Sequence, residues 1–292
     1  MDALLIDKQR MRRSFERAAA GYDHVAVLQR AVADRMADRL QFVKFTPVAM
    51  LDAGCGTGYA RHLLQQRYKG ARLLALDIAL NMLQVARGPQ SWWHKMQANR
   101  AGKVDFVCGD LESLPLQTGS VDLVWSNLAL QWCNDLDATF SGVRRVLAPN
   151  GLLMFSTFGP DTLKELRQAF GQADGYTHVS RFADMHDIGD ALMRAGFAEP
   201  VMDMEYFTLT YDDVSGLMRD LKALGAHNAT QGRRQGLAGK SAWRRMEAEY
   251  EKLRRDGKLP ATYEVVYGHA WAPAQLADGR QVVQMPLSRR DR

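Results

Sequence analysis

The feature that most constrains the fold is a regular alternation of short apolar runs with helical segments across residues 48–157. Apolar runs that suit buried strands occupy residues 48–53, 71–77, 103–108, 121–126 and 152–157. Segments with helical spacing separate them at 57–68, 81–87 and 135–147. Strands that alternate with helices over this length predict an α/β fold, with a parallel sheet, right-handed crossovers and helices on both faces.

The flanks of this core predict further parts. Residues 8–40 have helical spacing with a break at Gly21, so we expect an N-terminal helical cap over residues 1–45. Strand-like runs near 201–209 and 262–270 bracket a mostly helical stretch. We therefore expect a core over 46–210, a helical lid at 211–258, a last core strand within 259–276 and a loose polar tail at 277–292.

Composition and charge narrow the class of protein. The apolar share of 47% and the charged share of 24% are typical of a globular protein. No apolar run is long enough to cross a bilayer, and no signal peptide is evident. Cysteine occurs only three times and forms no CxxC pair, so we expect neither a disulfide framework nor a metal site. A cytoplasmic location fits these features.

A glycine-rich turn joins the first predicted strand to the first helix. Asp52 precedes it, and the turn itself holds Gly54, Cys55, Gly56 and Gly58. Glycines at this edge let the backbone turn tightly and approach a ligand. The spacing is G-x-G-x-G, with Tyr59 at the third glycine position of a dinucleotide-binding fingerprint, and an acid here would repel phosphate. S-adenosylmethionine (SAM), which carries positive charge and no phosphate, suits such a site.

The ends of the next strands add polar groups. Asp77, 19 residues after Gly58, is placed to accept ribose hydroxyls, although a helix-capping role would also explain it. Ile78 and Met82 can lie against an adenine ring or can simply pack their helix. After the third strand, Asp110 and the Leu111 amide can bind the adenine edge. Asn127, after the fourth strand, is predicted at the floor of the site.

These motifs, with the Asn150-Gly151 turn, resemble those of the class I SAM-dependent methyltransferases over roughly residues 45–160. The resemblance implies a Rossmann-like, seven-stranded sheet in the order 3-2-1-4-5-7-6, with the seventh strand antiparallel. It also implies SAM as cofactor, S-adenosylhomocysteine as product, and no resident metal.

A narrower resemblance extends to about residue 272. It rests on segments 15–23, 126–133, 155–166, 178–182, 224–228 and 262–268. They are similar to the BioC family, the malonyl-[acyl-carrier protein] O-methyltransferases of biotin biosynthesis. Asn150 and the segment 91–94 depart from the family pattern. The family implies methyl transfer from SAM to the free carboxylate of a malonyl thioester on acyl carrier protein.

The substrate side is less defined. A carboxylate is already ionised at neutral pH, since its ordinary pKa is near ~4, so the reaction needs no general base. Arg181 and His178 follow the fifth strand and its helix and are candidates to hold the malonyl carboxylate, because a guanidinium binds a carboxylate bidentately. Tyr22 is a candidate to close the site. It is equally plausible that Tyr22 is an ordinary core tyrosine and that Arg181 is an ordinary surface arginine.

A basic stretch at 231–258 predicts a docking surface for the acidic carrier protein. Its candidate side chains are Arg244, Arg245, Arg254 and Arg255, and Arg144 and Arg145 are further candidates before the fifth strand. An ordinary solvated helix face is the alternative explanation for all of them.

Three other functions stay open at this stage. The chain can be a SAM methyltransferase that acts on another small carboxylate or a quinone. It can resemble the respiratory assembly factors that modify a protein arginine. It can also be an NAD-dependent oxidoreductase, which binding measurements with SAM and NAD would separate.

Overall fold

The computed structural model describes residues 5–88, 103–173, 176, 178–226, 229–230, 239–275 and 281–282. A seven-stranded sheet has the order β3-β2-β1-β4-β5-β7-β6, which confirms the predicted topology. Strand β7 pairs antiparallel with both β5 and β6, whereas the other neighbouring pairs in this sheet are parallel. The strands are β1 (Ala49–Ala53), β2 (Arg72–Asp77), β3 (Val104–Cys108), β4 (Val121–Asn127), β5 (Leu147–Phe158), β6 (Ala198–Tyr211) and β7 (Leu259–Trp271). A separate pair holds β8 (Ala274–Gln275) and β9 (Gln281–Val282).

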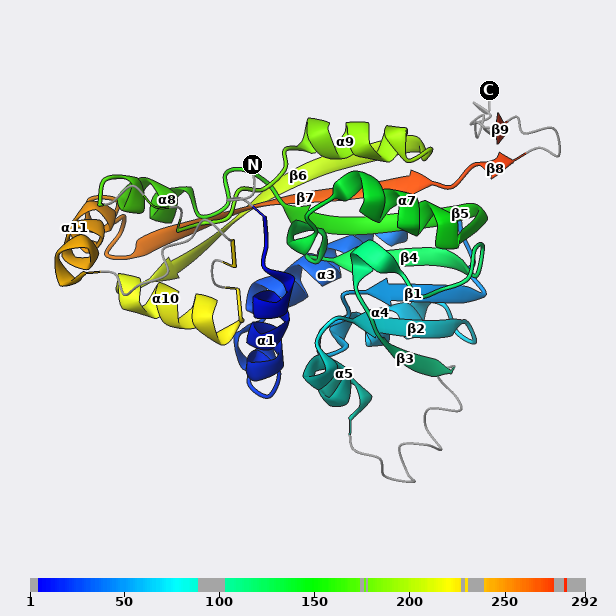
Figure 1. Cartoon of the computed structure of the whole chain (residues 1–292), viewed down its shortest axis with the longest axis horizontal. Coiled ribbons are helices and arrows are strands. Elements are labelled where there is room, and N and C mark those ends of the chain that lie inside the picture. Colours follow the sequence, from blue (N-terminus) through cyan, green and yellow to red (C-terminus); the bar gives the residue numbers. More distant parts are fainter. Residues whose placement is uncertain are drawn as a thin grey trace.

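Helices cover both faces of the sheet (Figure 1). They are α3 (Val27–Leu40), α4 (Tyr59–Arg67), α5 (Leu80–Arg87), α7 (Leu136–Val146) and α9 (Met185–Arg194). Met50 and Trp125 share a buried cluster with residues of α3 and α4. Their strand neighbours Leu51 and Val124 pack with α7 and α9 on the opposite face. This alternation follows from the two-residue period of a strand.

The N-terminal residues form α1 (Lys8–Ala18) and a short α2 (Tyr22–Val25), so the break predicted near Gly21 is confirmed. Asp7 caps α1 by accepting a hydrogen bond from the Arg10 amide (3.0 Å). In Figure 1, α1 lies beside the carboxyl ends of the central strands. It is therefore positioned to cover any ligand bound at that edge.

Three more helices gather where β6 and β7 extend beyond the rest of the sheet (Figure 1). They are α8 (Lys164–Gly171), α10 (Val214–Ala223) and α11 (Lys240–Glu251), and the short 3₁₀ turns are η2 (Leu111–Ser113) and η3 (Leu130–Trp132). Leu166, Leu217 and Met246 bring α8, α10 and α11 into one buried cluster. The predicted lid at 211–258 corresponds to α10 and α11. Of the predicted tail, only residues 281–282 are described. No helix in the described ranges is long and apolar enough to cross a membrane.

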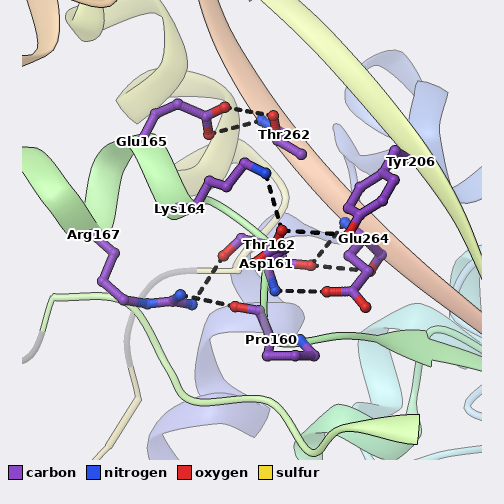
Figure 2. Close-up of polar contacts among 9 residues, drawn as sticks. All are labelled: Pro160, Asp161, Thr162, Lys164, Glu165, Arg167, Tyr206, Thr262 and Glu264. Carbon is purple, nitrogen blue, oxygen red and sulfur yellow. Dashed lines mark hydrogen bonds and ion pairs between the residues drawn. The ribbon is translucent and has the colours of Figure 1, made fainter.

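The loop between β5 and α8 is fixed by buried carboxylates of its neighbours (Figure 2). Glu264 of β7 accepts a hydrogen bond from the Asp161 amide (2.7 Å), and its backbone oxygen accepts one from the Thr162 hydroxyl (3.0 Å). Glu165 accepts from the amide of Thr262 (3.0 Å). Helix α8 begins only at Lys164, because these contacts hold the preceding residues in a loop.

Candidate active site

The glycine turn is locked to the neighbouring strand. The amides of Gly54 and Cys55 both donate to the Leu76 carbonyl (2.8 and 2.9 Å). Gly54, Gly56 and Gly58 all have positive φ, at 80°, 53° and 86°. A Cβ on Gly54 would lie 2.4 Å from that of Ala129, whereas one on Gly56 would meet nothing within 4 Å. The turn therefore needs glycine at position 54 for space as well as for backbone conformation.

Two buried carboxylates flank this turn. Asp77 accepts hydrogen bonds from the amides of Gly56 (2.9 Å) and Ala79 (2.8 Å). Asp52 is only 2% exposed, and its Oδ2 has no hydrogen-bond partner among the described residues. Burial, and then the charge of Asp77, raise the pKa of Asp52 to about 7. A buried carboxylate in this state favours a cationic ligand, which would restore its ionised form.

A cavity of about 110 Å³ lies against these groups. Its walls hold most of the residues predicted for the cofactor: Gly54, Gly56, Asp77, Ile78, Met82, Asp110, Leu111 and Asn127. Asp52 and Cys55 line a smaller adjoining pocket of about 50 Å³, which also contains Arg30. Gly58 lines neither, and caps α4 instead. Tyr22 lines both pockets, so it lies on the cofactor side of the site.

Helix α1 also closes this cavity, through residues that the sequence analysis did not single out. Lys8, Met11 and Phe15 line the cavity from α1. Lys8 Nζ lies 3.0 Å from an oxygen of Asp110 and 2.5 Å from one of Glu112. The sequence shows that residues 8, 11 and 15 share one face of a helix, but it does not show what this face packs against.

A larger chamber of about 650 Å³ adjoins the cofactor cavity. The two share a junction lined by Gln29, Gln131, Trp132, Phe158, Leu224 and Ala226. Asn127 fixes this junction, because its Nδ2 donates to the Gln29 carbonyl (3.0 Å) and its Oδ1 accepts from the Ser156 hydroxyl (2.8 Å). The Gln29 Oε1 is buried and has no partner in the described structure. The geometry suits a reaction between a nucleoside ligand on one side and a long substrate on the other.

The positioning candidates lie in different places. His178 lines the chamber and stacks on Phe170, with ring centroids 3.7 Å apart. Arg181 is exposed and lines a separate, smaller pocket with Gln131 and Thr157. Only His178 of these predicted residues therefore faces the chamber, and a contact between Arg181 and the substrate stays a prediction.

Two of the docking candidates, Arg144 and Arg145, form hydrogen bonds within their own chain. Arg144 donates to the Pro273 carbonyl (2.9 Å). Arg145 donates to the carbonyls of Leu114 (2.8 Å) and Leu116 (2.6 Å). Both guanidinium groups thus tie α7 to neighbouring loops.

The four candidates in the basic stretch divide into two pairs. Arg245 donates to the carbonyl of Ala173 (2.8 Å), and Arg254 pairs with Glu251 and the Asp212 carbonyl. Arg244 and Arg255 are exposed, and their side chains contact no partner in the described ranges. Only this second pair is available for docking without the loss of an internal contact.

Comparisons with known proteins agree with the fold. A model of the methyltransferase domain matches residues 51–155. The YcgJ protein of Bacillus subtilis has a TM-score of 0.56 at 13% identity, covering 81% of this chain and 97% of its own. A putative methyltransferase from Bacillus halodurans C-125 also gives 0.56, at 19% identity, covering 82% of this chain and 99% of its own. The fold and the site together define a class I SAM-dependent methyltransferase.

Sequence relatives define the family. A malonyl-[acyl-carrier protein] O-methyltransferase from Gallionella capsiferriformans is 59% identical, covering 97% of this chain and 98% of its own length. One of the same name from Laribacter hongkongensis is 57% identical, covering 97% of each. The chain belongs to the malonyl-[acyl-carrier protein] O-methyltransferase family. The predicted resemblance is thereby confirmed.

Proposed function

We propose that the protein transfers a methyl group from SAM to the free carboxylate of a malonyl thioester carried by acyl carrier protein. The methyl ester primes pimeloyl synthesis for biotin, and we place the reaction in the cytoplasm. Family membership supports this substrate. The structural observation that carries the proposal is the buried Asp52, whose Oδ2 has no hydrogen-bond partner among the described residues, beside a cavity that opens into a large chamber.

The residues present fit SAM. Asp52 offers an unsatisfied carboxylate oxygen to the ammonium group of SAM. Arg30 lines the same small pocket and is suited to the carboxylate of the methionine part. We assign the ribose to Asp77 and the adenine to the wall formed by Ile78, Met82, Asp110 and Leu111.

When bound, SAM supplies a methyl group on a sulfonium, and the reaction forms a carbon–oxygen bond while the sulfur–methyl bond breaks. The malonyl oxygen is already anionic, so the chain has no proton to remove. Its task at the junction is orientation, which can supply roughly 7–11 kcal/mol of a barrier. Gln29 and Gln131 provide amides there, while Trp132 and Phe158 exclude water.

The remaining assignments extend this proposal. His178 and Arg181 are positioning candidates for the substrate, and Tyr22 closes the cofactor side. Residues 211–258 act as a lid over the chamber, and the exposed Arg244 and Arg255 meet the acidic carrier protein. Residues Arg144, Arg145, Arg245 and Arg254 contribute mainly by holding this surface together. Family membership argues against the quinone, protein-arginine and NAD alternatives.

Mass spectrometry of malonyl-carrier protein after incubation with SAM tests the function. The carrier should gain the mass of one methyl group. Acetyl-carrier protein is the matched control, because it has the same thioester and arm but no free carboxylate, and its mass should not change. Methylation of a free acid or a protein arginine, with the malonyl-carrier unchanged, would refute the proposal.

A further inference from the structure

Among the described residues, three cationic side chains line the chamber, and none of them belongs to the predicted docking set. Arg10 and Arg17 come from α1, and Lys222 comes from the last turn of α10. All three residues are exposed, so they stand at the mouth of the chamber and not at its base. We call them the mouth cations.

The packing of α1 and α10 places these cations together. Residues seven apart return to nearly the same face of a helix, so Arg10 and Arg17 share a face, with Ser14 between them. Gly225, just after α10, packs against that face, where a Cβ would lie 3.1 Å from the Ser14 carbonyl oxygen. Glycine allows this close approach because it has no Cβ, and it also tolerates the positive φ of 71° at this position. Figure 1 shows α1 and α10 side by side.

The chamber behind the mouth is mainly apolar. Leu28, Leu166, Phe170 and Phe182 are among its lining residues. Its one carboxylate in the described lining is Asp220, which hydrogen bonds with Tyr211. A volume of about 650 Å³ lies within the usual range for small-molecule sites. A ligand that fits has one anionic group at the mouth and a long neutral body that reaches the junction.

We infer that the mouth cations bind the phosphate of the phosphopantetheine arm on which an acyl carrier protein holds its thioester. This inference rests on the proposed function. The arm has the required chemistry, because a single phosphate group at its protein end is followed by a neutral chain that ends in the thioester. Lys and Arg side chains are suited to phosphate. Binding at the mouth then leaves the acyl end directed to the junction with the cofactor cavity.

Two synthetic substrates isolate the phosphate. Malonyl-pantetheine and malonyl-4′-phosphopantetheine are identical except for that group. The unmodified protein should show a KM for the phosphorylated thioester about tenfold lower. The triple variant Arg10→Gln, Arg17→Gln, Lys222→Gln should raise the KM for the phosphorylated thioester about tenfold and leave that for malonyl-pantetheine within about twofold.

Arg12→Gln provides the matched control, because Arg12 lies on the opposite side of α1 and pairs with Glu16 (3.0 Å). It should leave both KM values unchanged. Calorimetric SAM binding should be the same in all variants and shows that the fold is retained. Equal KM values for the two thioesters with the unmodified protein, or an equal rise for both in the triple variant, would overturn the inference. Failure to methylate either thioester or malonyl-carrier protein would instead defeat the proposed function.

Discussion

The two halves of the site are built from different kinds of structure. The cofactor half stands on the carboxyl ends of β1, β2 and β4, whose register is fixed by parallel pairing. The chamber is enclosed by α1, α8, α10 and the β5–α8 loop, which come from distant parts of the chain. One half is therefore positioned by backbone hydrogen bonds within a sheet, and the other by packing between separate segments. A substitution in the cofactor half should therefore have a large effect at one position. Substitutions in the chamber half should have small effects that are spread over several residues.

The largest expected effect concerns space in the glycine turn. Gly54→Ala should reduce the free energy of unfolding by about 4 kcal/mol, since its Cβ would overlap Ala129 and its φ is positive. Gly56→Ala is the matched control, with the same sign of φ and open space, and should cost about 1 kcal/mol. Urea unfolding without ligand measures both. Equal losses in the two variants would mean that the contact with Ala129 does not limit which residue the turn accepts at position 54.

The second prediction concerns the charge of Asp52. SAM binding should weaken about tenfold for each pH unit below about 7, because the ammonium requires the ionised carboxylate. Asp52→Asn should lower the affinity about 50-fold at pH 8 and remove this pH dependence. Calorimetry from pH 5.5 to 8.5 makes the comparison. A loss of affinity below about pH 7 that persists in the variant would assign the titrating group elsewhere.

The same group has an opposite effect on stability. The pKa of Asp52 is raised in the folded protein, from 3.8 to about 7. Its contribution to stability is therefore present in full at low pH and is lost as the pH rises through about 7. Without SAM, Asp52→Asn should thus raise Tm at pH 8 and change it little at pH 4. This trade between binding and stability is expected where a ligand, not the protein, provides the counter-charge.

The contrast between the halves also explains what the sequence could predict. The strand order followed from the resemblance to the class I methyltransferases. The placement of Asp77, Asp110 and Asn127 followed from short motifs at strand ends, because the carboxyl ends of parallel strands meet at one edge of a sheet. Lys8 and the mouth cations were missed, since their roles depend on how α1 packs against residues more than 100 positions away. The same limit applies to Arg181: its distance from the fifth strand was readable, but the direction of its side chain was not.

The smallest expected effect tests the docking surface of the chamber half. Arg244→Glu with Arg255→Glu should raise the KM for malonyl-carrier protein about threefold at low salt, and this difference should shrink as salt rises. Malonyl-pantetheine should be unaffected, because it lacks the acidic carrier. Arg245→Glu with Arg254→Glu is the matched comparison, and should instead lower Tm, since these side chains hold Ala173, Glu251 and Asp212. A threefold rise in KM with the second pair, with Tm retained, would show that the internally bonded arginines also contact the carrier. In the chamber half, the same side chains would then serve both packing and recognition, although their hydrogen bonds indicate packing alone.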